Sequence, residues 1–215
     1  MTSLNEINFA ILAGGLNHDG SLPDRIIKVC DYIIDRINVE SRKCRVICSS
    51  AFSLNTPPKL DINNIPISES SSIAKYIETS ISDVRKVQIL CEQFSHDTVG
   101  NLIFLSEMFV KNFRIKALEI AVIDYHSDRV ILILKKLKKL NFFLDCNVNI
   151  RSIDSGISHS RIKERIEHEQ KASEKFSEEV SMLKSKRSFL RHMLTNHSCM
   201  NCCFSGRRII DNELY

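Results

Sequence analysis

Residues 8–48 have the sequence NFAILAGGLNHDGSLPDRIIKVCDYIIDRINVESRKCRVIC, and this stretch decides the fold prediction. Residues 8–12 form an apolar run that predicts a buried strand, which Gly14-Gly15 ends. Pro23 then opens a helix, because its fixed φ suits the first helical turn. The apolar side chains of this helix recur at the spacing of one helical face: Ile26, Ile27, Cys30, Ile33, Ile34 and Ile37. Residues 45–48 predict a second strand, so the stretch indicates one strand–helix–strand unit.

The same alternation continues to about residue 150. Ser68 is expected to cap a second helix that has Glu69 in its first turn. Further helices are expected over residues 97–113 and from Ser127 or Asp128 onward, and further strands over residues 87–91, 117–123 and 142–148. Strands and helices at this spacing form right-handed βαβ units. We therefore predict an α/β fold, a Rossmann-like parallel sheet with helices on both faces, whose ligand binds at the carboxyl ends of the strands.

The chain divides into four parts by composition: a sheet domain over residues 1–150, a linker over 151–160, one long amphipathic helix over 161–196 and a cysteine-rich tail over 197–215. The helix has no proline or glycine. Its apolar stripe comprises Ile162, Ile166, Phe176, Val180, Leu183, Leu190 and Leu194, and Glu169, Ser173 and Arg187 interrupt it. Such a stripe must cover either the chain's own sheet domain or a second copy of the chain, so a homodimer is one expectation.

Composition excludes several classes of protein. The net charge of +4 is too small to predict nucleic-acid binding, and no apolar run approaches the roughly 18 residues of a membrane-spanning helix. The first residues lack the basic stretch of a secretory signal, so the eight cysteines are expected to be reduced thiols in a cytoplasmic protein. The glycine motifs of dinucleotide-binding folds, P-loop NTPases and α/β-hydrolases are also missing from the sequence.

Polar residues gather where four of the predicted strands end. They are residues 14–20, Ser49-Ser50-Ala51, residues 92–98 with Asn101, and residues 124–129. All three histidines of the first 150 residues, His18, His96 and His126, lie in these loops. Loops are polar in any protein, but a parallel sheet makes these particular loops neighbours at one edge. The placement therefore predicts one polar ligand site.

The order of these residues resembles the YdcF/SanA/ElyC-like superfamily. That family carries a Gly-Gly turn after the first strand, a glutamate that opens the second helix, an E-x-x-S-x-x-T-x-x-N stretch and a Y/F-H-x-x-R element. The matching residues here are Gly14-Gly15, Glu69, Glu92 with Ser95, Thr98 and Asn101, and Tyr125-His126 with Arg129. Two departures stand out. Ser49-Ser50-Ala51 replaces a Ser-Gly-Gly sequence, and Asp97 replaces the asparagine before the threonine.

The resemblance implies a Rossmann-like enzyme that binds a small anionic or adenosine-containing ligand, for which S-adenosylmethionine is the candidate. We predict His126 as the acid–base group, because histidine titrates near neutral pH, with Asp124 or Glu92 orienting it or the substrate. The predicted ligand-binding residues are Gly14, Gly15, Asn17, Ser49, Glu69, Ser95, Thr98, Asn101, Tyr125 and Arg129. Arg129 could equally form a surface ion pair, and Glu69 and Glu92 could instead cap helices.

Two other functions fit the same residues. A metal-dependent hydrolase would use histidines and aspartates as ligands: His18, Asp19, His96, Asp97, Asp124, His126 and Asp128. A non-catalytic small-molecule sensor or partner-binding module would need no chemistry at all. A separate group has metal-ligand spacing: His197, Cys199, Cys202 and Cys203, with His192 one turn upstream. It predicts either a flexible tail with reactive thiols or a site for zinc or for contact between subunits.

Overall fold

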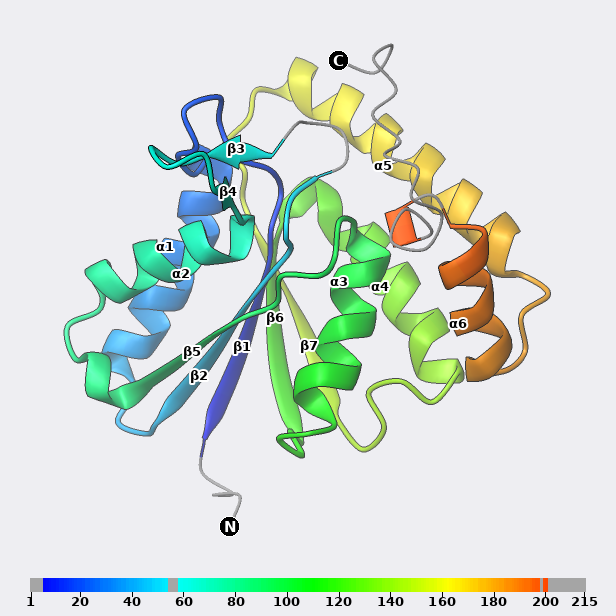
Figure 1. Ribbon diagram of the computed structural model, residues 1–215, viewed down its shortest axis with the longest axis horizontal. Helices are drawn as coiled ribbons and strands as arrows, with labels where there is room; N and C mark the ends of the chain where they lie inside the picture. The colour runs from blue at the N-terminus through cyan, green and yellow to red at the C-terminus, as the bar shows by residue number, and fades with distance from the viewer. Residues whose placement is uncertain (1–5, 54–57, 198, 201–215) are drawn as a thin grey trace.

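A computed structural model describes residues 6–53, 58–197 and 199–200. Its main feature is a five-stranded parallel sheet with the order β5-β2-β1-β6-β7 (Figure 1). The strands are β1 (Ile7–Leu12), β2 (Cys44–Ser49), β5 (Val87–Cys91), β6 (Ala117–Ile123) and β7 (Asn147–Ile153). The predicted α/β fold with a parallel sheet is therefore confirmed.

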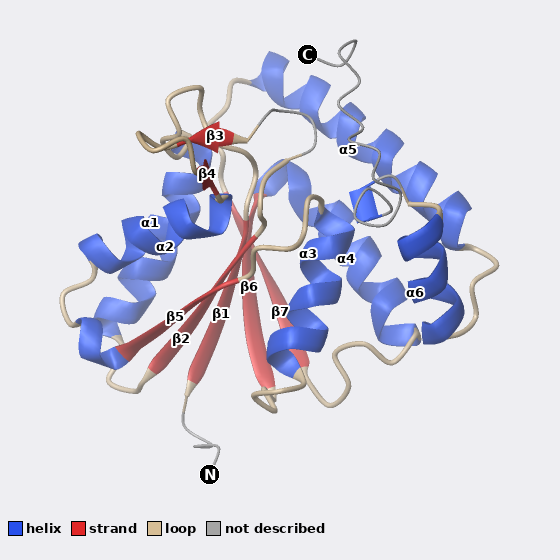
Figure 2. Cartoon of the chain, viewed as in Figure 1, coloured by secondary structure: helices blue, strands red, loops and turns tan. Residues whose placement is uncertain are grey.

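The side chains of β1 show why the sheet is covered on both faces. Phe9 and Ile11 belong to one apolar core and Ala10 and Leu12 to another, because successive side chains of a strand point to opposite faces. The first core lies under α1 (Asp24–Val39) and α2 (Glu69–Ser80). The second lies under α3 (Thr98–Phe104), the π-helical segment η2 (Leu105–Val110) and α4 (Asp124–Lys139) (Figure 2).

The strand order creates a switch point between β1 and β6. The chain moves outward from β1 through β2 to β5, and then crosses back past β1 to build β6 and β7 on the other side. At such a point the connections after the two central strands diverge to opposite faces and leave a crevice outside their carboxyl ends. The segments that follow Leu12 and Ile123 therefore flank the predicted ligand site.

The starts of α1, α2 and α3 follow the sequence predictions, and the start of α4 does not. Pro23 precedes α1, and the Ser68 side chain accepts a hydrogen bond of 3.1 Å from the backbone N–H of Ser71 to cap α2. The start of α4 was predicted at Ser127 or Asp128, but the helix begins at Asp124, directly after β6. An aspartate in the first turn is stabilised by the helix dipole, so strand and helix join without a loop.

The predicted fifth strand was misplaced. Residues 142–146 form turns, and Phe143 and Asp145 there have φ values of 54° and 56°, which extended strands do not adopt. Phe142 and Phe143 are nevertheless buried, because they pack into the core between α4 and the C-terminal helices. The strand runs from Asn147 to Ile153, so its end occupies the first part of the predicted linker.

The predicted single helix over residues 161–196 is two helices, α5 (His159–Val180) and α6 (Lys186–Thr195). Lys136 of α4 donates hydrogen bonds of 2.6 and 3.0 Å to the carbonyls of Val180 and Leu183, which satisfies free acceptors at the end of α5. Ser185 then caps α6 through a reciprocal pair of hydrogen bonds with Ser188. The helix is interrupted between Val180 and Lys186 because these tertiary and capping contacts stabilise the ends of two separate helices.

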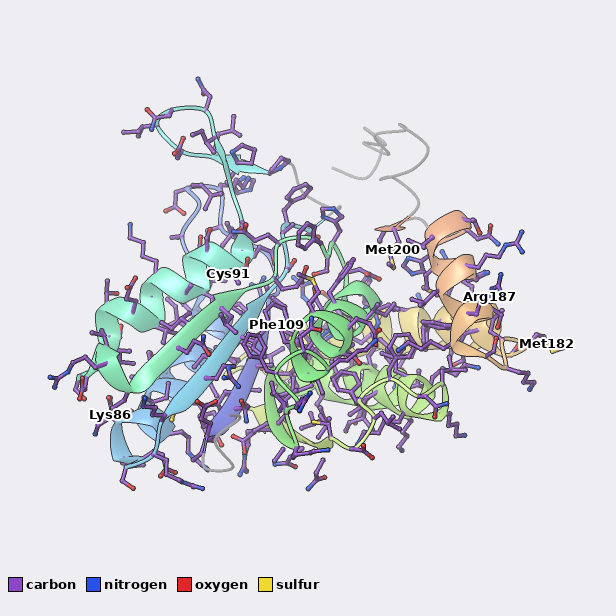
Figure 3. The ribbon with its side chains drawn as sticks, turned by 60° about the horizontal axis from the view of Figure 1, so that its bottom comes forward. Lys86, Cys91, Phe109, Met182, Arg187 and Met200 are labelled. Atoms are coloured by element: carbon purple, nitrogen blue, oxygen red, sulfur yellow. The ribbon has the colours of Figure 1, made fainter. Side chains whose placement is uncertain are left out.

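The buried apolar residues of α5 and α6 pack on the chain's own domain. Phe176, Val180, Phe189 and Met193 all join the core on the α4 side of the sheet. Met182, in the turn between the two helices, is 81% exposed and lies at the periphery of the molecule (Figure 3). The structure thus shows that the chain's own sheet domain covers these residues. A homodimer stays a prediction.

Three short elements complete the description. The strands β3 (Lys59–Leu60) and β4 (Pro66–Ile67) form a small antiparallel hairpin, and η1 (Val84–Lys86) is a single 3-10 turn. No described helix combines the length and the apolar character that crossing a membrane would need. Of the predicted tail, residues 198 and 201–215, with Cys202 and Cys203, lie outside the described part of the chain.

Candidate functional site

A cavity of about 520 Å³ lies at the carboxyl ends of β1 and β6. Its floor includes Leu12 and Ile123, the last residues of these two strands, and its outer wall is formed by α5. The site is therefore at the edge of the sheet that the sequence predicts. The predicted residues that line the cavity are Gly14, Gly15, Glu69, Thr98, Asn101, Tyr125, His126 and Arg129.

His126 stands in the first turn of α4 and is held on both ring nitrogens. Its Nδ1 lies 2.8 Å from Oε2 of Glu169 on α5, and its Nε2 lies 3.1 Å from Oγ1 of Thr98 at the start of α3. Because an ionised carboxylate only accepts hydrogen bonds, Nδ1 carries the proton towards Glu169, and Nε2 can accept one from Thr98. The three side chains form a carboxylate–imidazole–hydroxyl chain in the cavity wall.

Arg129 lies one turn beyond His126 and joins the same carboxylate. Its Nη1 is 3.4 Å from Oε2 of Glu169, and its side chain is only 17% exposed. Burial raises the pKa of Glu169, but the hydrogen bond and charge of His126 and the charge of Arg129 outweigh burial and lower that pKa below its ordinary value. The buried Nε of Arg129 has no hydrogen-bond partner among the described residues.

The two carboxylates predicted to orient His126 or the substrate, Asp124 and Glu92, make their described hydrogen bonds with residues other than His126. Asp124 does not line the cavity, and its two oxygens accept hydrogen bonds from the Tyr125 backbone at 2.8 Å and the Ser155 hydroxyl at 3.3 Å. Asp124 thus fixes the start of α4 to the segment after β7. Glu169 has the orienting position instead, because α5 folds across the cavity.

Glu92 holds two loops together beneath the cavity. It is fully buried, and its Oε1 accepts hydrogen bonds from the backbone N–H groups of Phe94 and Ser95 at 2.6 and 2.8 Å. Its Oε2 accepts from the backbone of Ser50 at 3.2 Å and contacts the Ser95 hydroxyl. This carboxylate therefore joins the loops after β2 and β5, and it does not reach the cavity.

Glu69 also joins two loops, those after β1 and β2, and in addition it lines the cavity. Its Oε2 accepts a hydrogen bond of 3.1 Å from the Gly15 backbone, and its Oε1 accepts one of 2.8 Å from the Ser53 backbone. Burial raises its pKa, and these two hydrogen bonds partly offset that effect. Gly15 has a φ of 91°, so the glycine there serves the turn that Glu69 holds.

Ser50 shows how the chain tolerates a departure from the resembled motif. It stands where that motif has glycine, and its φ of 95° lies in the region that favours glycine. Its backbone N–H is fixed by Glu92, so a buried carboxylate stabilises a strained conformation.

The other predicted binding residues have structural contacts. Asn17 donates to the Ser21 hydroxyl at 3.0 Å, and Ser49 donates to the carbonyl of Ile11 at 3.0 Å, so neither lines the cavity. Ser95 is buried between Glu92 and Asn101 and contacts both. Of this serine–asparagine pair, only Asn101 reaches the cavity.

The seven residues proposed as metal ligands do not converge in the described structure. His18 is exposed beside Lys59, and Asp19 accepts hydrogen bonds from Ser21 in the same loop. Among the described residues a single group of three could hold an ion, and it contains Asp97, His197 and Cys199. Only one of the seven candidates, Asp97, belongs to it.

The predicted site residues include none from α5, although this helix forms one wall of the cavity. Arg165, His168 and Glu169 of this helix line the cavity, as does Arg25 of α1. One signal for Glu169 was available, because this charged residue interrupts the apolar stripe of an otherwise regular amphipathic helix. A carboxylate at an inward position needs a buried partner, and His126 and Arg129 are that partner.

Comparisons of the chain with protein-family models, curated proteins and solved structures return no match. The fold and the cavity define the chain as an α/β protein with a polar crevice at the switch point of a parallel sheet.

Proposed function

We propose that the chain is an enzyme that binds an adenosine-containing ligand with an acidic group, such as S-adenosylmethionine, in the cavity, and that His126 is its acid–base group. The observation that carries the proposal is the buried guanidinium Nε of Arg129, for which the described residues supply no hydrogen-bond acceptor. A buried charged donor without an acceptor is unfavourable by about 1–3 kcal/mol. An acidic group of a ligand would supply the missing acceptor.

The size and position of the cavity support a small molecule. Its volume of about 520 Å³ falls within the range of roughly 300–1,000 Å³ that small-molecule sites occupy. Arg25 on one side and Arg129 and Arg165 on the other place three guanidinium groups around the cavity. The adenosine part of the proposal comes from the resemblance of the strand-end residues to YdcF-like proteins.

His126 has the contacts that an acid–base group needs. Glu169 holds Nδ1 and so fixes the tautomer and the ring orientation, while Nε2 faces the cavity wall at Thr98. A hydroxyl group of the ligand, or a water molecule bound with it, could replace the Thr98 hydroxyl at Nε2 and donate its proton there. Glu169 would then stabilise the charged ring in place.

A ligand-binding experiment tests the proposal. We expect S-adenosylmethionine to raise the melting temperature of the full chain, because a ligand specific for the folded state stabilises it. Arg129→Lys keeps the charge but loses the planar guanidinium, so it should weaken the affinity by about tenfold or more in calorimetry. Lys75→Arg, on the exposed side of α2, is the matched control and should change nothing.

The outcomes separate the alternatives. A His126→Gln variant that folds and binds S-adenosylmethionine normally, but turns it over on the order of 100-fold more slowly, supports the acid–base role. If adenosine, S-adenosylmethionine, adenine nucleotides and inorganic phosphate all leave the melting temperature unchanged, the enzyme proposal fails, and a partner-binding module explains the chain better.

A second candidate function rests on the Glu169–His126–Thr98 chain itself. Its connectivity is that of a carboxylate–histidine–hydroxyl triad, in which the histidine activates the hydroxyl for attack on an acyl or phosphoryl group. Thr98 Oγ1 would then bond to the acyl or phosphoryl group while the bond from that group to its leaving oxygen breaks, and His126 would take the hydroxyl proton and pass it to the leaving group. Water would later hydrolyse the ester on Thr98, which frees the acid product and restores the hydroxyl. A covalent adduct on Thr98 seen by mass spectrometry with an activated ester, and absent in Thr98→Val, would favour this hydrolase.

A further inference from the structure

Three potential metal ligands from distant parts of the chain meet at one side of the cavity. Asp97 precedes α3, whereas His197 and Cys199 follow α6. One ligand atom from each residue lies within 4.8 Å of the other two. All three residues line the cavity, and none of them is fully exposed. The fold therefore places a carboxylate, an imidazole and a thiol together although about 100 residues separate the first from the other two in the sequence.

The imidazole of His197 has one ring nitrogen near Asp97 and one without a hydrogen-bond partner among the described residues. Its Nε2 is 3.6 Å from Oδ2 of Asp97, which is longer than a hydrogen bond, although both side chains are only 13% exposed. Its Nδ1 is buried and has no hydrogen-bond partner within the described part of the chain. A buried ring nitrogen without a described partner is unfavourable, and a bound cation would remove that penalty by accepting its lone pair.

Asp97 has one oxygen to spare for an ion. Its Oδ1 accepts a hydrogen bond of 2.8 Å from the Gly100 backbone and caps α3, which leaves Oδ2 directed at His197. An asparagine, which stands here in the resembled motif, would cap the helix equally well but would bring no charge. The negative charge of Asp97 is therefore not needed to cap the helix.

The ligand types select the metal. A thiolate, an imidazole and a carboxylate are the ligands of Zn²⁺, whereas Mg²⁺ and Ca²⁺ prefer sites made of oxygen atoms alone. Zinc bonds of about 2.0–2.3 Å place tetrahedral ligand atoms about 3.5 Å apart. The present separations need to close by about 1 Å, which side-chain torsions at the end of α6 can supply.

We propose that Asp97, His197 and Cys199 bind one Zn²⁺ ion, which fastens the segment after α6 to the start of α3. Three protein ligands leave a fourth position, and that position is available to water or to the ligand of the cavity because all three residues line it. The ion would stand in the same cavity as His126. This proposal is independent of the function proposed above, since zinc binding can be measured without any organic ligand.

Metal titration of the full chain tests the site. The reduced protein is freed of metal with a chelator, dialysed, and titrated with Zn²⁺ alone while bound metal and melting temperature are measured. We expect one tightly bound Zn²⁺ per chain and a higher melting temperature. Replacement by Co²⁺ should give the thiolate-to-cobalt charge-transfer absorption of a cysteine ligand and the intense visible bands of tetrahedral geometry.

Matched variants identify the ligands. Cys199→Ser should abolish the charge-transfer band, and His197→Gln and Asp97→Asn should each weaken zinc binding by about tenfold or more. Asp97→Asn keeps the helix cap, so its effect cannot be attributed to the loss of α3. The controls are Cys91→Ser, which removes an exposed thiol elsewhere, and His192→Gln in α6, and both should bind zinc as the parent chain does.

Three results would overturn the proposal. The first is a chain that retains no zinc after dialysis. The second is a charge-transfer band that survives Cys199→Ser and disappears in Cys202→Ser or Cys203→Ser, because the thiolate would then come from another part of the tail. The third is an Asp97→Asn variant with the zinc affinity of the parent chain, which would leave the carboxylate as a helix cap only.

Discussion

Two walls of the cavity use their polar residues in opposite ways. The loop wall consists of the segments after β1, β2 and β5, where the carboxylates of Glu69 and Glu92 accept hydrogen bonds from backbone N–H groups. The helix wall consists of α4 and α5, where the charged side chains contact one another. On the loop wall the carboxylates are fully used, whereas on the helix wall the Nε of Arg129 has no described partner.

This difference separates the residues that build the site from those available to a ligand. A carboxylate that accepts several backbone hydrogen bonds fixes loop geometry, and a ligand could bind it only by disrupting those loops. A buried guanidinium whose Nε has no described partner, or an imidazole whose Nε2 contacts only a side-chain hydroxyl, can exchange partners without unfolding anything. We therefore expect substitutions on the loop wall to lower stability, and substitutions on the helix wall to change binding.

The largest expected effect comes from Glu92. Replacing it by alanine leaves the buried N–H groups of Phe94, Ser95 and Ser50 without an acceptor, so the free energy of unfolding should fall by about 3 kcal/mol or more. Urea denaturation measures the change. Glu78→Ala on the exposed face of α2 is the control and should shift stability by less than about 0.5 kcal/mol. A Glu92→Ala chain as stable as the parent would refute the assignment of Glu92 to the framework.

The next largest effect on stability is expected at the end of α5, where this helix packs on the core. Val180 at the end of α5 is buried in the core, so Val180→Lys should lower the free energy of unfolding by about 2 kcal/mol or more. Met182→Lys, two residues on and exposed, should have almost no effect. Size-exclusion chromatography with light scattering adds the second readout. Should Val180→Lys halve the mass and leave stability intact, the stripe would be a dimer interface instead.

The two cavity carboxylates should respond to pH with opposite signs. The raised pKa of Glu69 means that the folded state holds its proton more tightly, so its contribution to stability falls as pH rises from the ordinary value of 4.5 through the folded pKa. The lowered pKa of Glu169 means that its contribution is complete above 4.5 and is lost as pH falls through the folded pKa.

Unfolding free energies of the parent, Glu69→Gln and Glu169→Gln chains across an acidic pH series check these signs. Relative to Glu69→Gln, the parent should lose stability as pH rises above 4.5. Relative to Glu169→Gln, it should lose stability as pH falls below 4.5. If both differences have the same sign, the two carboxylates do not occupy the contrasting environments that separate the two walls.

The smallest expected effect tests backbone strain in the loop wall. Ser50→Gly places a residue with no Cβ at a φ of 95°, so it should raise the free energy of unfolding by about 0.5 kcal/mol. Ser50→Ala removes the same hydroxyl and keeps the strain, which makes it the matched control. The glycine variant should be the more stable of the two in urea denaturation, and the reverse order would show that φ at this position stores no strain.

Sequence patterns predicted the elements whose signals are local. The first four strands, the cap at Ser68 and the start of a helix at about Asp97 were predicted correctly, because apolar runs and capping residues act within one element. The pattern failed over residues 142–148, where two buried phenylalanines belong to a turn that the core covers. An apolar run shows that a segment is buried, but it does not show whether the backbone there is extended.

The sequence by itself determined the parallel α/β fold, the edge of the sheet at which the cavity lies, and eight of the residues that line it. Periodicity fixes which faces are apolar, and a parallel sheet brings the ends of its strands together. Only the tertiary structure decided that Glu169 orients His126 and that Glu92 lies beneath the site. The reason is physical: hydrogen-bond partners are set by positions in space, and the fold brings Glu169 of α5 beside His126 although the two residues are 43 positions apart in the sequence.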